Sequence, residues 1–187
     1  MKRSLLALTL LAALPFAASA AEGVSYSFVE GGYVRTDLEG TGTNDDADGF
    51  SVRGSGAIAP NFHVFGDYAK QEVDEDFDFD QWRLGVGYNQ ELNTRVDLLT
   101  RVAYEKFDAG SGFDFDGYSV EAGVRGALTP MLEGYALAGY EDGDGLDGDF
   151  YGRVGAQVKF NPTWGINGEV KFADGDSQYF IGPRISF

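Results

Sequence analysis

The sequence predicts an all-β protein, a transmembrane antiparallel up-and-down β-barrel of about ten strands in a bacterial outer membrane. Three observations support this fold class. A short apolar segment at the N-terminus ends on small residues, strand-like segments alternate apolar with polar or small residues, and short turns alternate with acidic loops. Eight strands are the alternative if one hairpin is irregular.

The first twenty residues have the features of an export signal. Lys2 and Arg3 precede an apolar run, and the run ends at Ala18-Ser19-Ala20, a small-residue site of the type that signal peptidases cleave. The run is shorter than the roughly 20 residues of a spanning helix. We therefore expect residues 1–20 to be a signal peptide and residues 21–187 to form one outer-membrane barrel domain. An uncleaved N-terminal anchor is the alternative.

The composition favours strands that are held together by backbone pairing. The chain has 27 glycines, 15 phenylalanines and 10 tyrosines, no cysteine, and no long segment with helical spacing. Its formal net charge is −16. Nucleic acid is not an expected partner, because binding to phosphates depends on Lys and Arg. The lack of cysteine excludes disulfides and thiolate metal sites.

Two kinds of connection give the strand count. Four short segments carry turn residues such as Pro and Asn, and five acidic segments, most of them longer, alternate with them. The expected turns are 59–62, 88–91, 128–131 and 160–163, and the expected loops are 37–48, 72–80, 108–116, 141–149 and 174–176. Nine connections join ten strands, and an even number returns both termini to one side of the membrane. We expect the short turns to be periplasmic and the acidic loops extracellular.

Period-two alternation separates an apolar face from a charged face. Leu98 and Val102 alternate with Asp97 and Arg101. Leu99 lies at the same parity as Asp97 and Arg101, so it belongs to the charged face. We expect arginine to be tolerated better at Leu99 than at Leu98. A soluble barrel would show the same alternation, but with the apolar face toward the interior and the charged face toward water. Aromatic residues near the strand ends favour two membrane girdles, with the apolar face toward lipid; they are Phe62, Tyr88, Tyr104, Tyr118, Phe150, Phe160, Trp164 and Phe172.

The charged face carries both signs in comparable numbers, so in a narrow barrel these side chains should pair across the lumen. We expect Glu121 to pair with Arg101 or Arg125. Asp67 and Lys159 share this face. The predicted lumen charge network comprises Arg53, Arg83, Arg95, Asp97, Arg101, Glu105, Glu121, Arg125, Arg153, Glu169, Lys171 and Arg184.

Two further candidates for chemistry are weak. The single histidine, His63, lies beside the predicted turn at Pro60, at the end opposite to the outer rim where enzymatic barrels place a catalytic histidine, so no enzyme is expected. The acidic segment 141–149 resembles a calcium loop, but Arg153 stands where an EF-hand has its bidentate Glu. We expect no cofactor and no firm metal site, only weak Ca²⁺ or Mg²⁺ binding by Asp142, Asp144, Asp147 and Asp149.

The chain ends on an aromatic residue that has apolar residues at the same parity. Such an end resembles the C-terminal signature by which outer-membrane proteins are recognised by their assembly machinery. The residues of this assembly signal are Tyr179, Ile181, Ile185 and Phe187.

Two segments carry a resemblance to a known family. Residues 24–33 (VSYSFVEGGY) and 80–89 (DQWRLGVGYN) look like those of small outer-membrane proteins from Xanthomonas-type bacteria, the sulfation-dependent quorum factor family. The resemblance extends from the signal peptide to Phe187 and implies an outer-membrane barrel. The family label also implies a secreted, sulfated signal perceived by host plants. Tyr26 and Tyr33 fall in the first predicted strand, where a modified tyrosine would be hard to expose, so we do not expect the signalling role.

The sequence therefore predicts a monomeric outer-membrane barrel with a structural, adhesion or surface-recognition role. Its expected partners are membrane lipid, lipopolysaccharide, the assembly machinery, and a host or surface partner that contacts the acidic loops. A small passive pore is the first alternative. A secreted soluble barrel that binds an apolar ligand is the second.

Overall fold

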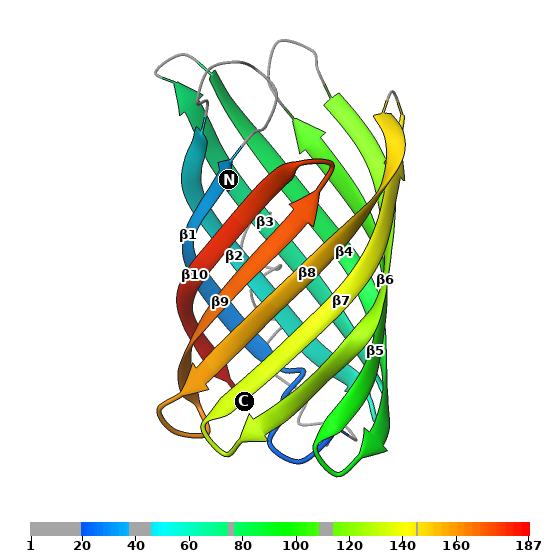
Figure 1. Cartoon of the computed structure of the whole chain (residues 1–187), viewed down its shortest axis with the longest axis vertical. Coiled ribbons are helices and arrows are strands. Elements are labelled where there is room, and N and C mark those ends of the chain that lie inside the picture. The colour runs from blue at the N-terminus through cyan, green and yellow to red at the C-terminus, as the bar shows by residue number, and fades with distance from the viewer. Residues whose placement is uncertain (1–19, 38–45, 75–76, 109–113, 145) are drawn as a thin grey trace, which may run out of the picture.

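The computed structural model describes residues 20–37, 46–74, 77–108, 114–144 and 146–187, and its strands form one closed barrel (Figure 1). Every strand is antiparallel to its sequence neighbours, and β1 also pairs with β10. The strand count is therefore ten and not eight. The strands are β1 (Phe28–Asp37), β2 (Asp46–Ala59), β3 (Phe62–Asp74), β4 (Phe77–Asn93), β5 (Val96–Asp108), β6 (Asp114–Thr129), β7 (Leu132–Gly143), β8 (Leu146–Lys159), β9 (Trp164–Ala173) and β10 (Asp176–Ser186).

The strands are longer than a membrane requires. About 9–11 residues suffice to cross a bilayer, whereas β4 has 17 residues and β6 has 16. Part of the excess lies at the end with the acidic connections, which we call the loop end. Acidic segments that the sequence analysis expected as loops are partly strand there, including Asp46 and Asp78.

The opposite end, which we call the turn end, carries the short connections. Those at Pro60, Pro130 and Pro162 lie where they were expected. The remaining one was misplaced, because the chain turns at Thr94 and Arg95 and not at residues 88–91. The Asn93 side chain stabilises this turn by accepting a hydrogen bond of 2.9 Å from the Arg95 backbone N–H.

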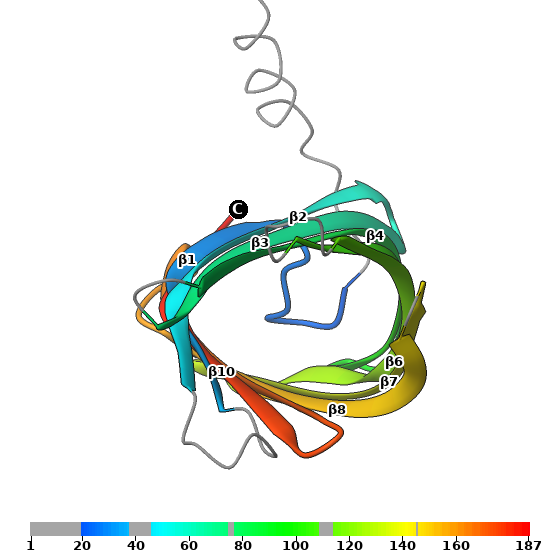
Figure 2. The ribbon, with the colours of Figure 1, turned by 90° about the horizontal axis from the view of Figure 1, so that it is seen from above.

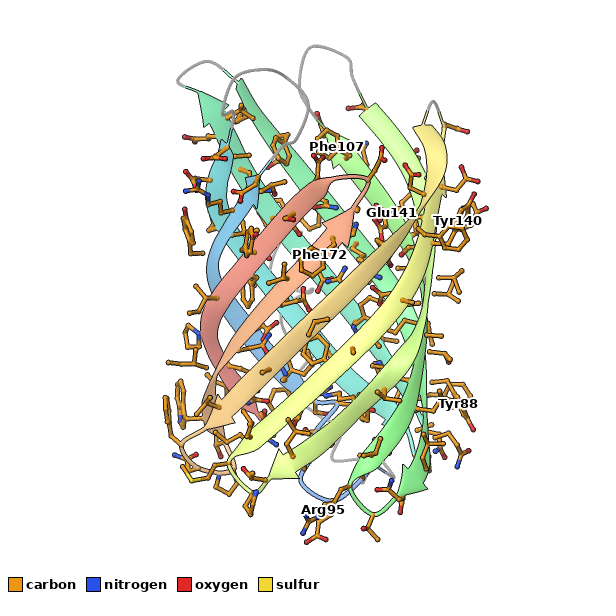
Figure 3. The ribbon with its side chains drawn as sticks, viewed as in Figure 1. Tyr88, Arg95, Phe107, Tyr140, Glu141 and Phe172 are labelled. Atoms are coloured by element: carbon orange, nitrogen blue, oxygen red, sulfur yellow. The ribbon has the colours of Figure 1, made fainter. Side chains whose placement is uncertain are left out.

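The outer surface confirms that the apolar face points outward. Leu84 is 68% exposed and Phe150 is 81% exposed, so the soluble barrel with an apolar interior is wrong. Aromatic residues gather near both ends, and Figure 3 shows Tyr140 on the outside toward the loop end and Tyr88 toward the turn end. The exposed members of the predicted girdles are Phe62, Tyr104, Tyr118, Phe150, Phe160, Trp164 and Phe172. The predicted assembly signal also lies outward on β10, with Tyr179, Ile181 and Ile185 exposed and followed by Phe187.

The interior holds the polar face and one additional segment. Residues 20–27 precede β1 and lie inside the barrel at the turn end (Figure 2). Tyr26 of this segment forms a small apolar cluster with Leu99 and Leu137. No helix among the described residues is long and apolar enough to cross a membrane.

The seam between β1 and β10 contains a close approach of the two backbones. The register runs through Glu30↔Arg184 and resumes at Tyr33↔Ile181. A Cβ at Gly32 would overlap the carbonyl oxygen of Ile181, so only glycine fits there. Glycine at this position lets the first and last strands lie against each other.

Candidate functional site

The candidate site is the lumen, which ion pairs cross at mid-height. Arg53 of β2 donates to Glu169 of β9 at 2.8 Å, although β2 and β9 are not neighbours in the barrel. Arg153 of β8 joins the two central carboxylates, with 2.8 Å to Glu169 and 3.1 Å to Glu121. Arg83 of β4 then contacts Glu121 at 3.0 Å. The chain of charges therefore runs from one wall of the barrel to the other.

Further side chains complete this central layer. Arg83 contacts Glu105 at 2.9 Å, and Arg101 lies 3.9 Å from Glu121. Hydroxyl groups also donate to the carboxylates, from Tyr151 to Glu121 at 2.9 Å and from Tyr135 to Glu169 at 2.5 Å. Charged groups out of bulk water are costly unless they are paired and hydrogen-bonded. Each charged group of this layer has a partner of opposite sign, although some of its atoms, such as Glu121 Oε2 and Arg101 Nε, accept or donate no hydrogen bond within the described residues.

A second layer lies nearer the turn end. Glu133 of β7 accepts a hydrogen bond from Arg125 and forms an ion pair with Lys159 at 2.7 Å. Glu30 of β1 accepts from Arg184 at 2.6 Å, and Arg53 lies 3.8 Å from Glu30, which links the two layers. Two guanidinium groups also lie over aromatic rings, Arg53 at 3.9 Å from Phe180 and Arg184 at 4.0 Å from Phe28.

These layers leave little space in the middle of the barrel. The cavity there has a volume of about 30 Å³, and its lining includes Arg53, Arg101, Arg153 and Glu169. That volume suits about one water molecule.

The structure brings most of the predicted network together and corrects part of it. Arg95 is outside the network, because it lies exposed in the turn between β4 and β5 (Figure 3). Of the two expected partners of Glu121, Arg101 lies near it, whereas Arg125 pairs with Glu133. Asp97 faces inward but contacts the N-terminal segment. The pair of Lys171 with Glu141, at 2.5 Å, lies above the central layer.

Sequence reasoning missed Glu30 and Glu133, which are both nearly fully buried. Glu30 alternates with the exposed Val29, a signal that was available in the sequence. Glu133 lies next to the turn at Pro130 and reads from the sequence as a solvated turn residue. Its partner Lys159 comes from the neighbouring strand β8, so the pair becomes visible only once the register is known.

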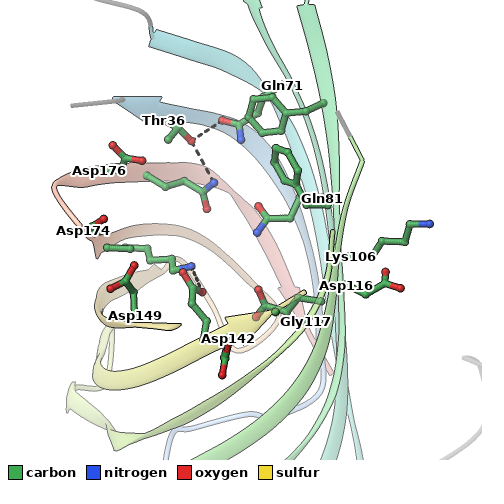
Figure 4. A pocket seen from close by; sticks show the side chains of 18 of the residues that line it. Thr36, Gln71, Gln81, Lys106, Asp116, Gly117, Asp142, Asp149, Asp174 and Asp176 are labelled. Carbon is green, nitrogen blue, oxygen red and sulfur yellow. Dashed lines mark hydrogen bonds and ion pairs between the residues drawn. The ribbon is translucent and has the colours of Figure 1, made fainter. Parts of the chain in front are cut away.

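The loop end of the lumen opens into a vestibule of about 500 Å³. One wall is aromatic, with Phe79 of β4 and Phe107 of β5 at a ring distance of 4.9 Å. Amide and charged groups also line the vestibule, and Figure 4 shows Thr36 between Gln71 and a second amide. Thr36 donates to Gln71 at 2.9 Å and accepts from Gln178 at 3.2 Å. An aromatic wall that faces hydrogen-bonding groups can hold a small amphipathic molecule.

The four acidic residues predicted to bind divalent cations do not converge in the described part of the chain, where no group of three acidic or histidine residues could hold a metal ion. Asp142 and Asp149 both line the vestibule, and Asp142 also accepts a hydrogen bond from the outward-facing Tyr118. Asp144 is exposed in the connection between β7 and β8. The side chain of Asp147 lies outside the described residues.

His63 is fully buried on β3 near the turn end. Its ring stacks on Tyr26 with centroids 4.7 Å apart and an interplanar angle of 18°. It therefore packs the N-terminal segment against the barrel wall and lies far from the vestibule.

Comparisons with known proteins agree with the fold. No protein-family model and no curated protein matches the chain. The KdgM porin, solved in complex with disordered oligogalacturonate, is similar with a TM-score of 0.50 at 15% identity, over 86% of this chain and 99% of that chain. The translocator domain of the autotransporter NalP from Neisseria meningitidis gives 0.48 at 12% identity, over 89% and 90%. Ail, the attachment invasion locus protein of Yersinia pestis, gives 0.43 at 14% identity, over 87% and 99%.

These neighbours are outer-membrane barrels, and at such identities the likeness concerns the fold alone. None of them supports the sulfation-dependent quorum factor family in particular, so that resemblance stays a prediction.

Proposed function

We propose that this barrel resides in the outer membrane as a closed, non-enzymatic scaffold whose loop end serves adhesion or surface recognition. The ion pairs that cross the lumen carry this proposal. A pore requires a continuous aqueous path, and here buried, paired side chains occupy mid-height while residues 20–27 lie inside the barrel at the turn end. The vestibule, in contrast, leaves the loop end free to contact a partner.

The proposed orientation places the loop end outside the cell and the turn end in the periplasm. Lipid then surrounds the apolar outer surface, and the acidic strand extensions face lipopolysaccharide. Like charges at that surface repel each other unless cations screen or bridge them. Weak Ca²⁺ or Mg²⁺ binding at the loop end is therefore part of the proposal, together with monomeric insertion by the assembly machinery through the end of β10.

Conductance across a planar bilayer tests the closed lumen. We expect the purified protein to give no steady single-channel current under conditions in which a reconstituted porin conducts. A large and steady conductance would overturn the closed scaffold and favour the small passive pore.

A second experiment tests recognition at the loop end. Cells that display the protein are measured for retention on immobilised glycans and matrix proteins, with Asp114, Asp142 and Asp144 changed together to Asn. We expect retention that this triple variant reduces, while Glu91→Gln at the turn end leaves it unchanged. Absence of retention, or equal loss in both variants, would argue against recognition through these carboxylates.

A further inference from the structure

Asp97 is a buried carboxylate without a cation in the described part of the chain. Its exposed fraction is 0%, and it forms no ion pair with a described side chain. Arg125 lies opposite Asp97 in the β5–β6 ladder but pairs with Glu133, and Arg101 pairs with Glu121. A buried carboxylate is costly unless a positive charge or several hydrogen bonds compensate it. The groups that contact Asp97 directly must therefore compensate its charge.

The groups that do contact Asp97 come from the N-terminal segment. The Ala21 backbone nitrogen lies 3.1 Å from Oδ1 and 3.2 Å from Oδ2, and the Tyr26 hydroxyl donates to Oδ2 at 3.0 Å. Ala21 is itself only 2% exposed. The carboxylate therefore holds one particular nitrogen of the main chain, at the residue that follows the predicted cleavage site.

The rest of the segment fixes this nitrogen in place. The Glu22 N–H donates to the Thr94 carbonyl at 2.8 Å, and Arg125 donates to the Ser25 carbonyl at 2.9 Å. Lys159 donates to the Gly23 carbonyl, and the Tyr26 ring packs on His63. Side chains from several strands thus hold a segment that has no strand pairing of its own.

We propose that Asp97 is the docking site for the α-ammonium group of Ala21, which forms when a signal peptidase hydrolyses the Ala20–Ala21 peptide bond. One water molecule is consumed, the C–N bond breaks, Ala20 leaves as a carboxylate and Ala21 carries the ammonium. The amide has one hydrogen to share between both carboxylate oxygens, whereas the ammonium has three and a full positive charge. Processing thereby supplies the missing cation and locks residues 21–27 inside the barrel.

Chemical labelling of the α-amine tests this pair. The full chain is expressed with its leader, purified from outer membranes in detergent, and its intact mass is compared with that of residues 21–187. The folded protein is then treated with an amine-reactive acylating ester and digested with trypsin. The first tryptic peptide, residues 21–35, contains no lysine, so its acylation reports on the α-amine alone.

The ester reacts with the uncharged amine, which an ion pair disfavours. We expect acylation of this peptide to be at least about tenfold slower in the unchanged protein than in Asp97→Asn, as for a pair that shifts protonation by about one pH unit. Glu91→Gln is the matched control, because Glu91 lies opposite Asp97 on β4 but is exposed. It should label as slowly as the unchanged protein, and all forms should label alike in denaturant.

A second variant keeps Asp97 and moves the amine. Insertion of Gly-Ser between Ala20 and Ala21 places the new ammonium two residues away, so its peptide should label as fast as that of Asp97→Asn. This variant decides the question if Asp97→Asn does not fold. The proposal fails if the purified protein retains residues 1–20, or if the unchanged protein labels as fast as the insertion variant.

Discussion

At the level of single residues, the central carboxylates carry the largest consequences. Glu121 has no exposed side-chain surface and lies near three arginines. Arg83 and Arg153 each have another carboxylate partner, Glu105 and Glu169, but Arg101 has its only ion pair among the described residues with Glu121. Loss of Glu121 therefore leaves Arg101 buried beside other positive charges.

We expect Glu121→Ala to lower the free energy of unfolding by about 3–5 kcal/mol, as for a broken buried pair. Adding Arg101→Met should restore part of this loss, because the double variant leaves no unpaired charge at that position. Urea unfolding of the folded barrel in vesicles, followed by tryptophan fluorescence, measures both. Glu121→Ala with Arg125→Met is the control, and equal rescue in it would contradict the specific pairing.

Leu99 shows where alternation in the sequence is insufficient. Its parity predicts a place on the charged face, which is correct, and hence better tolerance of arginine than at the outward Leu98. The structure instead buries Leu99 against Tyr26 and Leu137. The sequence could not show this cluster, because one of its members comes from outside the strands.

We now expect Leu99→Arg to be at least as destabilising as an outward arginine in the lipid-facing band, about 2–4 kcal/mol. Val102→Arg on the outer surface is the comparison, and the same urea measurement applies. A clearly smaller effect at Leu99 would show that residues 20–27 leave room there for a hydrated side chain.

At the level of elements, the sequence predicted the number, order and facing of the strands, because period two and turn residues repeat along the whole chain. It misplaced one turn. The actual connection is at Thr94 and Arg95, directly after Asn93, but Asn89 offers the same turn chemistry a few residues earlier. Tyr88 pairs with Thr100 in the ladder, so residues 88–91 are strand. This error also assigned Arg95 to the lumen.

The N-terminal segment is the element that no strand pattern predicted. Deleting residues 21–26 removes the partners of Asp97 and exposes Leu99, so we expect a lower urea midpoint than in the unchanged protein. We expect no channel from this deletion alone, since the central layer still crosses the lumen. Planar-bilayer recordings measure this, and a steady current from the deletion variant would place the closure at the turn end alone.

At the level of the whole molecule, orientation can be tested cleanly because the chain has no cysteine. Single cysteines at Asp114 or Asp144, both exposed at the loop end, should react with a membrane-impermeant maleimide on intact cells. Cysteines at Pro130 or Pro162, exposed at the turn end, should react only after the outer membrane is permeabilised. The reverse pattern would invert the proposed orientation.

The seam between β1 and β10 also sets the order in which this chain can be completed. All other pairings join neighbours in sequence, so each can form as a hairpin as soon as its second strand is present. Closure alone needs the first and the last strand together. A chain arrested before Gln178 therefore keeps two free strand edges, whose unsatisfied N–H and C=O groups cost several kcal/mol each in lipid. In this protein, the removal of both free strand edges therefore depends on a single strand, β10 (Asp176–Ser186).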